Sequence, residues 1–227
     1  MKYLVIASHP DDEILGCGGS MAKWSREGNE VHILILAEGV TSRDKNRNRE
    51  YRKDEISMLT QAAKRAADIL NVKSLKLFNY PDNRMDSLDL LDVVKFIENN
   101  IEKLKPDAVV THHIGDLNID HQKTHQAVIT ACRPHLVQTV KRILSFEVPS
   151  ATEWQSPTLG APFVPNWFED ISATIELKLK ALNAYESEMR EWPHARSIEA
   201  VEYLARWRGA SMGLKAAEAF SLIRQLR

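Results

Sequence analysis

The stretch that decides the fold is HPDDEILGCGG at residues 9–19. It follows the apolar run YLVIA at residues 3–7 and precedes residues 20–27, which favour a helix. We therefore expect residues 9–19 to form the turn between a first strand and a first helix. In open α/β sheets, turns of this kind lie at the edge where ligands bind.

This turn concentrates ionisable side chains, because His9 is closely followed by the acids Asp11, Asp12 and Glu13. Carboxylates so close together repel one another and are costly to desolvate unless a positive charge compensates them. A bound metal ion is the simplest compensation. The alternative is that His9 and Asp12 only cap the first helix, whose N-terminal amides need acceptors.

Composition limits the class of protein. With 227 residues, of which 44% are hydrophobic and 27% charged, the chain is expected to form a single domain over residues 1–227. A net charge of -1 gives no electrostatic footprint for nucleic acid or an anionic membrane surface. No apolar run reaches the roughly 18 residues needed for a membrane span. Two cysteines in dissimilar contexts and no signal peptide favour a cytoplasmic location.

Beyond the turn, strand-like and helix-like segments alternate, which favours a Rossmann-like α/β fold with a mainly parallel sheet and helices on both faces. We expect the functional site at the C-terminal ends of the strands. Residues 219–227 fit either a helix or an edge strand. The expected strands are residues 31–37, 75–79, 107–111 and 143–148, and the expected helices are residues 50–70, 87–104, 178–189 and 198–207, with another ending at residue 133.

Residues 149–170 lack a clear period and are rich in proline and aromatic residues. A loop of this length in a compact domain is usually functional or disordered, and the aromatic content argues against disorder. We expect it to line the substrate site. Trp154, Phe163 and Trp167 could stack on the ring of a ligand, or they could simply hold the loop by hydrophobic contacts.

A second polar cluster, residues 112–125, completes a metal-binding hypothesis. His9 and Asp12 are three residues apart and could bind one ion, and His121 could supply a third ligand. Two histidines and one carboxylate with an open fourth position are typical of catalytic zinc sites. Zinc would lower the pKa of its water to about 7 and polarise a carbonyl. Asp11 would then act as the general base and later protonate a leaving amine.

Together, HPDDEILGCGG at residues 9–19 and DLNIDHQKTH at residues 116–125 resemble the LmbE-like, PIG-L-type family of zinc-dependent N-acetylglucosaminyl de-N-acetylases. The likeness covers most of residues 1–135. The later stretches EVPSATEW, PNWFEDIS, WPHARS and AEAF look like a subset of bacterial members associated with glycan synthesis. The resemblance implies a Zn²⁺ cofactor, with another divalent metal such as Fe²⁺ possible, an amino-sugar substrate and homo-oligomers.

The resemblance also implies roles for single residues. In many relatives the acid matching Asp120 orients a histidine two residues earlier, whose imidazolium stabilises the oxyanion. This chain has Asn118 there, and an amide can donate a hydrogen bond but carries no charge. His113, His125 and His194 are the candidate replacements. The metal ligands and the general base implied by the family are His9, Asp12, His121 and Asp11.

Substrate recognition depends on less specific signals. Arg43, Arg84 and Arg196 lie in loops near strand ends or motif-like stretches, where a guanidinium could bind sugar hydroxyls, a phosphate or a uronate. Solvated surface charge is an equally good interpretation of each arginine. Trp154 and His194 are further candidates for contacting substrate.

Three functions compete on this sequence. The first is a zinc-dependent hydrolase that removes acetyl from an N-acetylated amino sugar. The second is a non-haem iron oxygenase, since two histidines and a carboxylate also bind iron, although its usual barrel disagrees with the βαβ pattern. The third is a sugar- or nucleotide-binding metal protein without catalysis. Asp11 favours an enzyme, because a pure binder has little need of a free carboxylate beside the metal.

Overall fold

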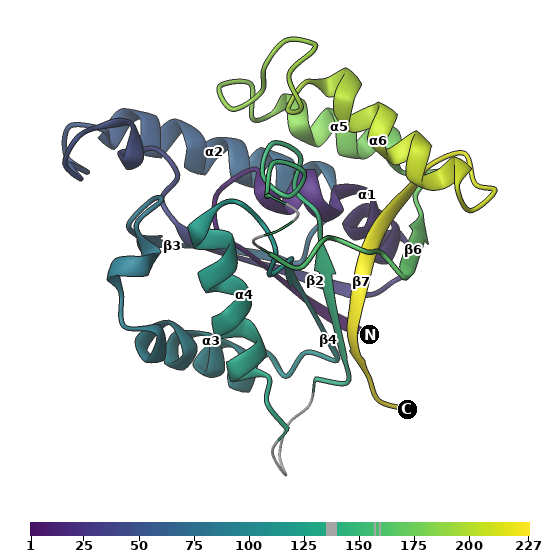
Figure 1. Cartoon of the computed structure of the whole chain (residues 1–227), viewed down its shortest axis with the longest axis horizontal. Helices are drawn as coiled ribbons and strands as arrows, with labels where there is room; N and C mark the ends of the chain where they lie inside the picture. Colours follow the sequence, from purple (N-terminus) through teal and green to yellow (C-terminus); the bar gives the residue numbers. More distant parts are fainter. Residues whose placement is uncertain (135–139, 157, 159) are drawn as a thin grey trace.

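Strands and helices alternate along most of the chain in a computed structural model, which describes residues 1–134, 140–156, 158 and 160–227 (Figure 1). The elements are β1 (Lys2–Ala7), α1 (Asp12–Arg26), β2 (Glu30–Ala37), α2 (Lys53–Ile69), β3 (Ser74–Tyr80), α3 (Leu90–Leu104), β4 (Ala108–His112), α4 (Ile119–Ala131), β5 (Arg142–Phe146), β6 (Trp167–Asp170), α5 (Ile175–Asn183), α6 (Ile198–Ala210) and β7 (Ala217–Gln225). Two 3₁₀ turns, at Thr41–Arg43 and Met85–Ser87, follow β2 and β3.

The strands of the described residues form one seven-stranded sheet in the order β3-β2-β1-β4-β5-β7-β6. The pairs from β3 to β5 are parallel, whereas β7 runs antiparallel to both β5 and β6. The predicted Rossmann-like class is therefore confirmed. The C-terminal segment is a strand rather than a helix, but not an edge strand, because β7 pairs with β5 on one side and β6 on the other. Part of the aromatic segment, Trp167–Asp170, is itself a strand and forms that edge of the sheet.

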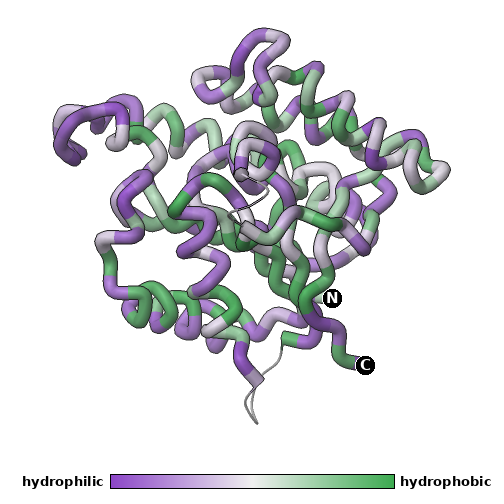
Figure 2. The backbone as a smooth tube through the Cα atoms, viewed as in Figure 1, coloured by the Kyte–Doolittle hydropathy of each residue, from purple (hydrophilic) through white to green (hydrophobic). Residues whose placement is uncertain are grey.

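Helices cover both faces of the sheet, so its central strands are apolar on both sides (Figures 1 and 2). Tyr3 and Val5 of β1 pack in a core with residues of α1, α2, α5 and α6. Leu4 and Ile6, which point to the opposite face, pack with residues of α3 and α4. No helix among the described residues is long and apolar enough to cross a membrane.

The order of the strands brings the two polar clusters together. β1 lies between β2 and β4, and it pairs in parallel with β4 at Val5 and Val110. The turn after β1 therefore lies beside the loop after β4 at the C-terminal edge of the sheet. A hydrogen bond from the Ser8 amide to His112 Nε2, 2.8 Å long, joins the two strand ends.

The first helix begins at Asp12, earlier than the expected start near residue 20, and contains a kink at Cys17. Two charged side chains from distant elements satisfy the backbone groups that the kink exposes. Lys178 Nζ donates to the carbonyl of Leu15 over 2.8 Å, and Glu218 accepts from the amides of residues 19–20 over 2.9 and 2.7 Å. Lys178 and Glu218 also form a buried ion pair.

The glycines near the start of α1 allow close packing. A Cβ atom at Gly16 would lie 2.3 Å from the ring of Phe146, and one at Gly19 would lie 2.8 Å from Ile171. The helix therefore approaches β5 and the start of α5 more closely than any larger residue permits.

We predict that Glu218→Gln destabilises the fold, because it leaves Lys178 buried without its ion-pair partner. Removing one member of a buried pair costs about 3 kcal/mol, which corresponds to a fall in Tm of roughly 6 to 12 °C for a chain of this size. Thermal unfolding measures the change. The control is Glu50→Gln, which removes an exposed pair with Lys53 and should shift Tm by less than about 2 °C. Equal shifts in the two variants would show that the buried Lys178–Glu218 ion pair does not stabilise the fold.

Candidate active site

The three predicted metal ligands meet at the C-terminal edge of the sheet. His9 Nδ1 lies 3.2 Å from Asp12 Oδ2, and His121 Nε2 lies 3.1 Å from the same oxygen. Candidate ligand atoms of all three residues lie within 4.8 Å of one another. The side chains come from the turn between β1 and α1 and from the first turn of α4, and all three residues are buried.

Unpaired buried atoms of this cluster fit a metal ion. Asp12 Oδ1 and both ring nitrogens of His121 have no hydrogen-bond partner among the described residues, although each is shielded from solvent. A buried polar atom without a partner is costly, and a cation would supply the missing partner. Two imidazole nitrogens and one carboxylate also match the three protein ligands of catalytic zinc sites.

An outer layer of carboxylates contacts the two histidines. His9 Nε2 lies 2.9 Å from Asp120 Oδ2, and His121 Nδ1 lies 3.0 Å from Asp116 Oδ2. Each histidine thus turns one ring nitrogen to an outer carboxylate and the other to Asp12. Carboxylates placed in this way fix the tautomer and the orientation of metal-binding histidines.

The charge of the cluster favours a cation. Burial acts against protonation of His121, but the carboxylates of Asp12 and Asp116 outweigh burial and raise its pKa to about 9. His9 behaves alike: burial lowers its pKa, whereas Asp12 and Asp120 raise it, and the net result lies well above the usual value. Negative charge therefore exceeds positive charge around both rings.

Asp11 lies beside this cluster in an unusual backbone conformation. Its φ of 116° falls in the region that non-glycine residues rarely adopt, and such strain is found mainly at functional sites. The Asp11 amide donates to Glu13 Oε2 over 3.1 Å, and Tyr185 donates to the other oxygen of Glu13. Burial raises the pKa of Asp11 to about 7, with Arg196 opposing the shift and Asp12 reinforcing it.

Asp120 connects the cluster to the loop after β3. Besides contacting His9, it accepts hydrogen bonds from the amides of Asn83 and Met85 over 2.7 and 2.8 Å. The oxygen of the Asn118 side chain caps α4 by accepting from the amide of Asp120, and its Nδ2 donates to Asn83 Oδ1 over 2.8 Å. Both ends of the Asn118 amide are therefore engaged in holding backbone and loop.

The candidate replacements for the missing histidine at position 118 occupy different places. His113 Nε2 lies 3.0 Å from the carbonyl of Ala161, so it contacts the described part of the segment 149–170. His125 Nδ1 lies 2.8 Å from the carbonyl of His112. His194 is the one of the three that approaches Asp11 indirectly, because its ring accepts a hydrogen bond from the amide of Arg196.

The substrate candidates divide into two groups. Arg43 pairs with Glu188 at 2.8 Å, and Arg84 donates to the carbonyls of residues 44–45, so both guanidiniums hold loops. Trp154 is 52% exposed and lies edge-on to His194 with ring centroids 5.7 Å apart. Trp154 and His194 therefore lie near Arg196 and Asp11.

Sequence reasoning missed the roles of two residues at this site. Asp116 stands in the quoted motif DLNIDHQKTH, and its place in the loop before α4 was the available signal. The sequence indicates Arg196 as a substrate ligand or as solvated surface charge, yet its Nη1 lies 2.9 Å from Asp11 Oδ2. The segment 149–170, apart from residues 157 and 159, which lie outside the described residues, contributes Thr152, whose hydroxyl donates to Asp116 over 2.9 Å.

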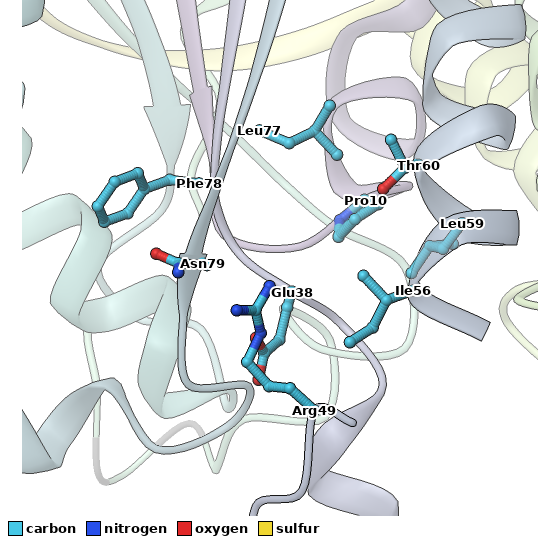
Figure 3. Close-up of a pocket in the computed structure, with 9 residues that line it drawn as sticks. All are labelled: Pro10, Glu38, Arg49, Ile56, Leu59, Thr60, Leu77, Phe78 and Asn79. Atoms are coloured by element: carbon cyan, nitrogen blue, oxygen red, sulfur yellow. The ribbon is translucent and has the colours of Figure 1, made fainter. Parts of the chain in front are cut away.

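A separate cavity of about 500 Å³ opens between α2 and β3 (Figure 3). Pro10 is its only lining residue from the turn at residues 9–12, and none of the candidate metal ligands lines it. Glu38 and Arg49 face each other at one end, opposite apolar side chains. The lining residues are Pro10, Glu38, Arg49, Ile56, Leu59, Thr60, Leu77, Phe78 and Asn79.

A mainly parallel α/β sheet with a buried histidine and aspartate cluster at its C-terminal edge defines a Rossmann-like protein with a candidate metal site. The chain belongs to the PIG-L family: the family model described as GlcNAc-PI de-N-acetylase matches residues 4–132. The resemblance expected from the HPDDE and DH motifs is thereby confirmed.

Proteins similar to this chain carry names of deacetylases. One is the uncharacterized deacetylase YaiS of Escherichia coli K12, which is 30% identical over 190 residues that cover 81% of this chain and 90% of that protein. The diacetylchitobiose deacetylase of Thermococcus kodakarensis is 26% identical over 224 residues, which cover 87% of this chain and 76% of that protein.

A solved structure of a protein with another activity is also similar. The match to GalB, the 4-carboxy-2-hydroxymuconate hydratase of Pseudomonas putida KT2440, has a TM-score of 0.78 at 20% identity and covers 100% of this chain and 98% of that one. This last likeness shows the fold alone.

We predict that His121→Ala loses most of the bound metal, because one of three protein ligands disappears. The protein is dialysed against zinc and then buffer, and its zinc content is measured by mass spectrometry. His125→Ala is the matched control, since it removes a histidine one helical turn further along α4, and it should retain zinc. Full zinc occupancy in His121→Ala would show that the distal ligand is another residue.

Asp116→Asn should weaken zinc binding without abolishing it. The substitution keeps the size of the side chain but removes the charge that faces His121 Nδ1, and loss of such a partner lowers metal affinity by about 10- to 100-fold. Competition with a fluorescent chelator measures the change. An unaltered affinity would mean that Asp116 serves only its contacts with residues 118 and 152.

Proposed function

We propose that this chain is a zinc-dependent hydrolase that removes the acetyl group from an N-acetylated amino sugar or its conjugate. The observation that carries the proposal is the buried cluster of His9, Asp12 and His121, with Asp12 Oδ1 lacking a partner and Asp11 alongside. Membership of the PIG-L family and the deacetylase names of its relatives support the same reaction.

His9, Asp12 and His121 would hold the metal. Zinc bound by such a set supplies Lewis acidity toward a carbonyl and toward water. Asp11 accepts a proton from the attacking water and later donates it to the departing nitrogen. The new bond joins the water oxygen to the acetyl carbon, the carbon–nitrogen bond breaks, and the products are acetate and a free amino sugar.

Asp120 and Asp116 prepare the site for this reaction without touching the reacting atoms. Asp120 keeps His9 turned so that Nδ1 faces Asp12, and Asp116 does the same for Nε2 of His121. Because the rings are already oriented, binding a metal needs little rearrangement. Asn118 accepts from the Asp120 amide and donates one N–H to Asn83, so its side chain links the start of α4 to the loop after β3.

Zinc is the proposed metal because a deacetylation needs a Lewis acid without redox chemistry, and zinc has none. The same donor set is used by non-haem iron oxygenases, and Fe²⁺ is therefore the alternative to be measured. The doubly wound sheet with antiparallel β7 and β6 differs from the barrel that usually carries that iron site. The metal bound by protein purified without added zinc distinguishes the two.

Trp154 and His194 are the residues that we propose to contact the sugar. The exposed face of Trp154 lies near the loop that carries Arg196 and is available for stacking on an apolar ring face. Arg43 and Arg84 would contribute by holding the loops around the site. We propose a cytoplasmic location, because Cys17 and Cys132 are both free thiols.

Asp11→Asn should lower the release of acetate by about a hundredfold or more, while zinc content stays the same. Zinc-loaded protein is incubated with a panel of N-acetylated monosaccharides, disaccharides and nucleotide sugars, and acetate and free amine are both measured. Asp54→Asn, an exposed carboxylate in the first turn of α2, is the control and should keep full activity. Undiminished turnover in Asp11→Asn would remove Asp11 from the mechanism.

A further inference from the structure

The loop between α5 and α6 contacts the turn between β1 and α1, which carries Asp11. Arg196, 185 residues after Asp11 in the sequence, directs Nη1 to Asp11 Oδ2 over 2.9 Å. Its Nε donates to the hydroxyl of Ser150 over 2.7 Å. The Arg196 side chain is only 24% exposed, so the guanidinium lies largely inside the protein.

The guanidinium is held from several sides. The amide of Arg196 donates to His194 Nδ1 over 3.0 Å, and the next residue, Ser197, caps α6 by accepting from the amide of Ala200. The Ser150 hydroxyl holds the guanidinium at its Nε atom. A side chain anchored at its backbone, at its Nε and at its Nη1 has little freedom to follow a substrate.

Asp11 needs a group of this kind. It is buried and adjacent to the acidic Asp12, and its strained φ of 116° sets only the backbone, not the rotamer. A buried carboxylate without a cation nearby is costly, and it would turn toward whichever donor is closest. Arg196 is the cation that the structure places against this carboxylate.

We propose that Arg196 is a positioning residue that fixes the carboxylate of Asp11 for proton transfer. This inference rests on the proposed function and deepens it. Arg196 places a permanent positive charge beside the turn that carries Asp11, whereas the Asn118 side chain is uncharged. The alternative role is a direct contact between Arg196 and the sugar, and the kinetic test below separates the two.

The contact itself is tested without any substrate. A double-mutant cycle compares Tm for the unaltered protein, Arg196→Met, Asp11→Asn and the double variant. Arg196→Met alone should lower Tm by about 5 °C, because it leaves a buried carboxylate unpaired. In the Asp11→Asn background the same substitution should lower Tm by less than half as much. Equal falls in both backgrounds would overturn the proposed pairing.

The role in the reaction is tested by separating kcat from KM. Arg196→Met should lower kcat by about 10- to 100-fold with KM within threefold and zinc content unchanged, and Arg196→Lys should recover part of kcat. Arg208→Met is the matched control, since Arg208 forms a similar ion pair with Glu147 and is 23% exposed. It should leave kcat and zinc content unchanged.

Three outcomes would overturn the inference: a raised KM with unchanged kcat, which indicates substrate binding; a loss of zinc; or no change in either kinetic constant. If Arg196→Met fails to fold, Arg196→Lys and Ser150→Ala are compared instead, and each should lower kcat more than KM changes. Absence of acetate release from the unaltered, zinc-loaded protein would contradict the proposed function, and the Tm cycle would still decide the pairing.

Discussion

The site depends on one carboxylate shared by two histidines. Asp12 Oδ2 lies 3.2 Å from His9 Nδ1 and 3.1 Å from His121 Nε2, in a place with no solvent access. The rings can meet there only because β1 and β4 are neighbours in the sheet and their following turns lie side by side. A buried group of this composition is stable when a cation compensates it, so a metal bound by these three residues would also stabilise the fold.

Outer contacts extend this constraint to the surrounding loops. Asp120 contacts His9 and also accepts two amides of the loop after β3, so one carboxylate orients a ligand and holds a wall of the site. Asn118 joins the same loop through Asn83. Asn118 thus links the start of α4 to the loop after β3. Arg196, on a different element, places Nη1 2.9 Å from Asp11 Oδ2.

Local sequence patterns predicted much of the fold and the three candidate metal ligands. The alternation of apolar segments predicted the parallel strands, and the HPDDE and DH motifs predicted the three residues that the structure brings together. Contacts between segments that are distant in the sequence could not be predicted from local patterns. The kink of α1 depends on contacts with Lys178 and Glu218, and the environment of Asp11 depends on Arg196; no local pattern indicates these contacts.

The division between predictable and unpredictable residues has a functional meaning. A hydratase shares this fold at a TM-score of 0.78, so the sheet does not by itself determine the reaction. The family match ends at residue 132, after both ligand-bearing motifs. Ser150, Tyr185 and Arg196, which hold Asp11 directly or through a neighbour, all lie beyond it. The first part of the chain thus carries the candidate metal ligands, and the remainder supplies the side chains that surround Asp11.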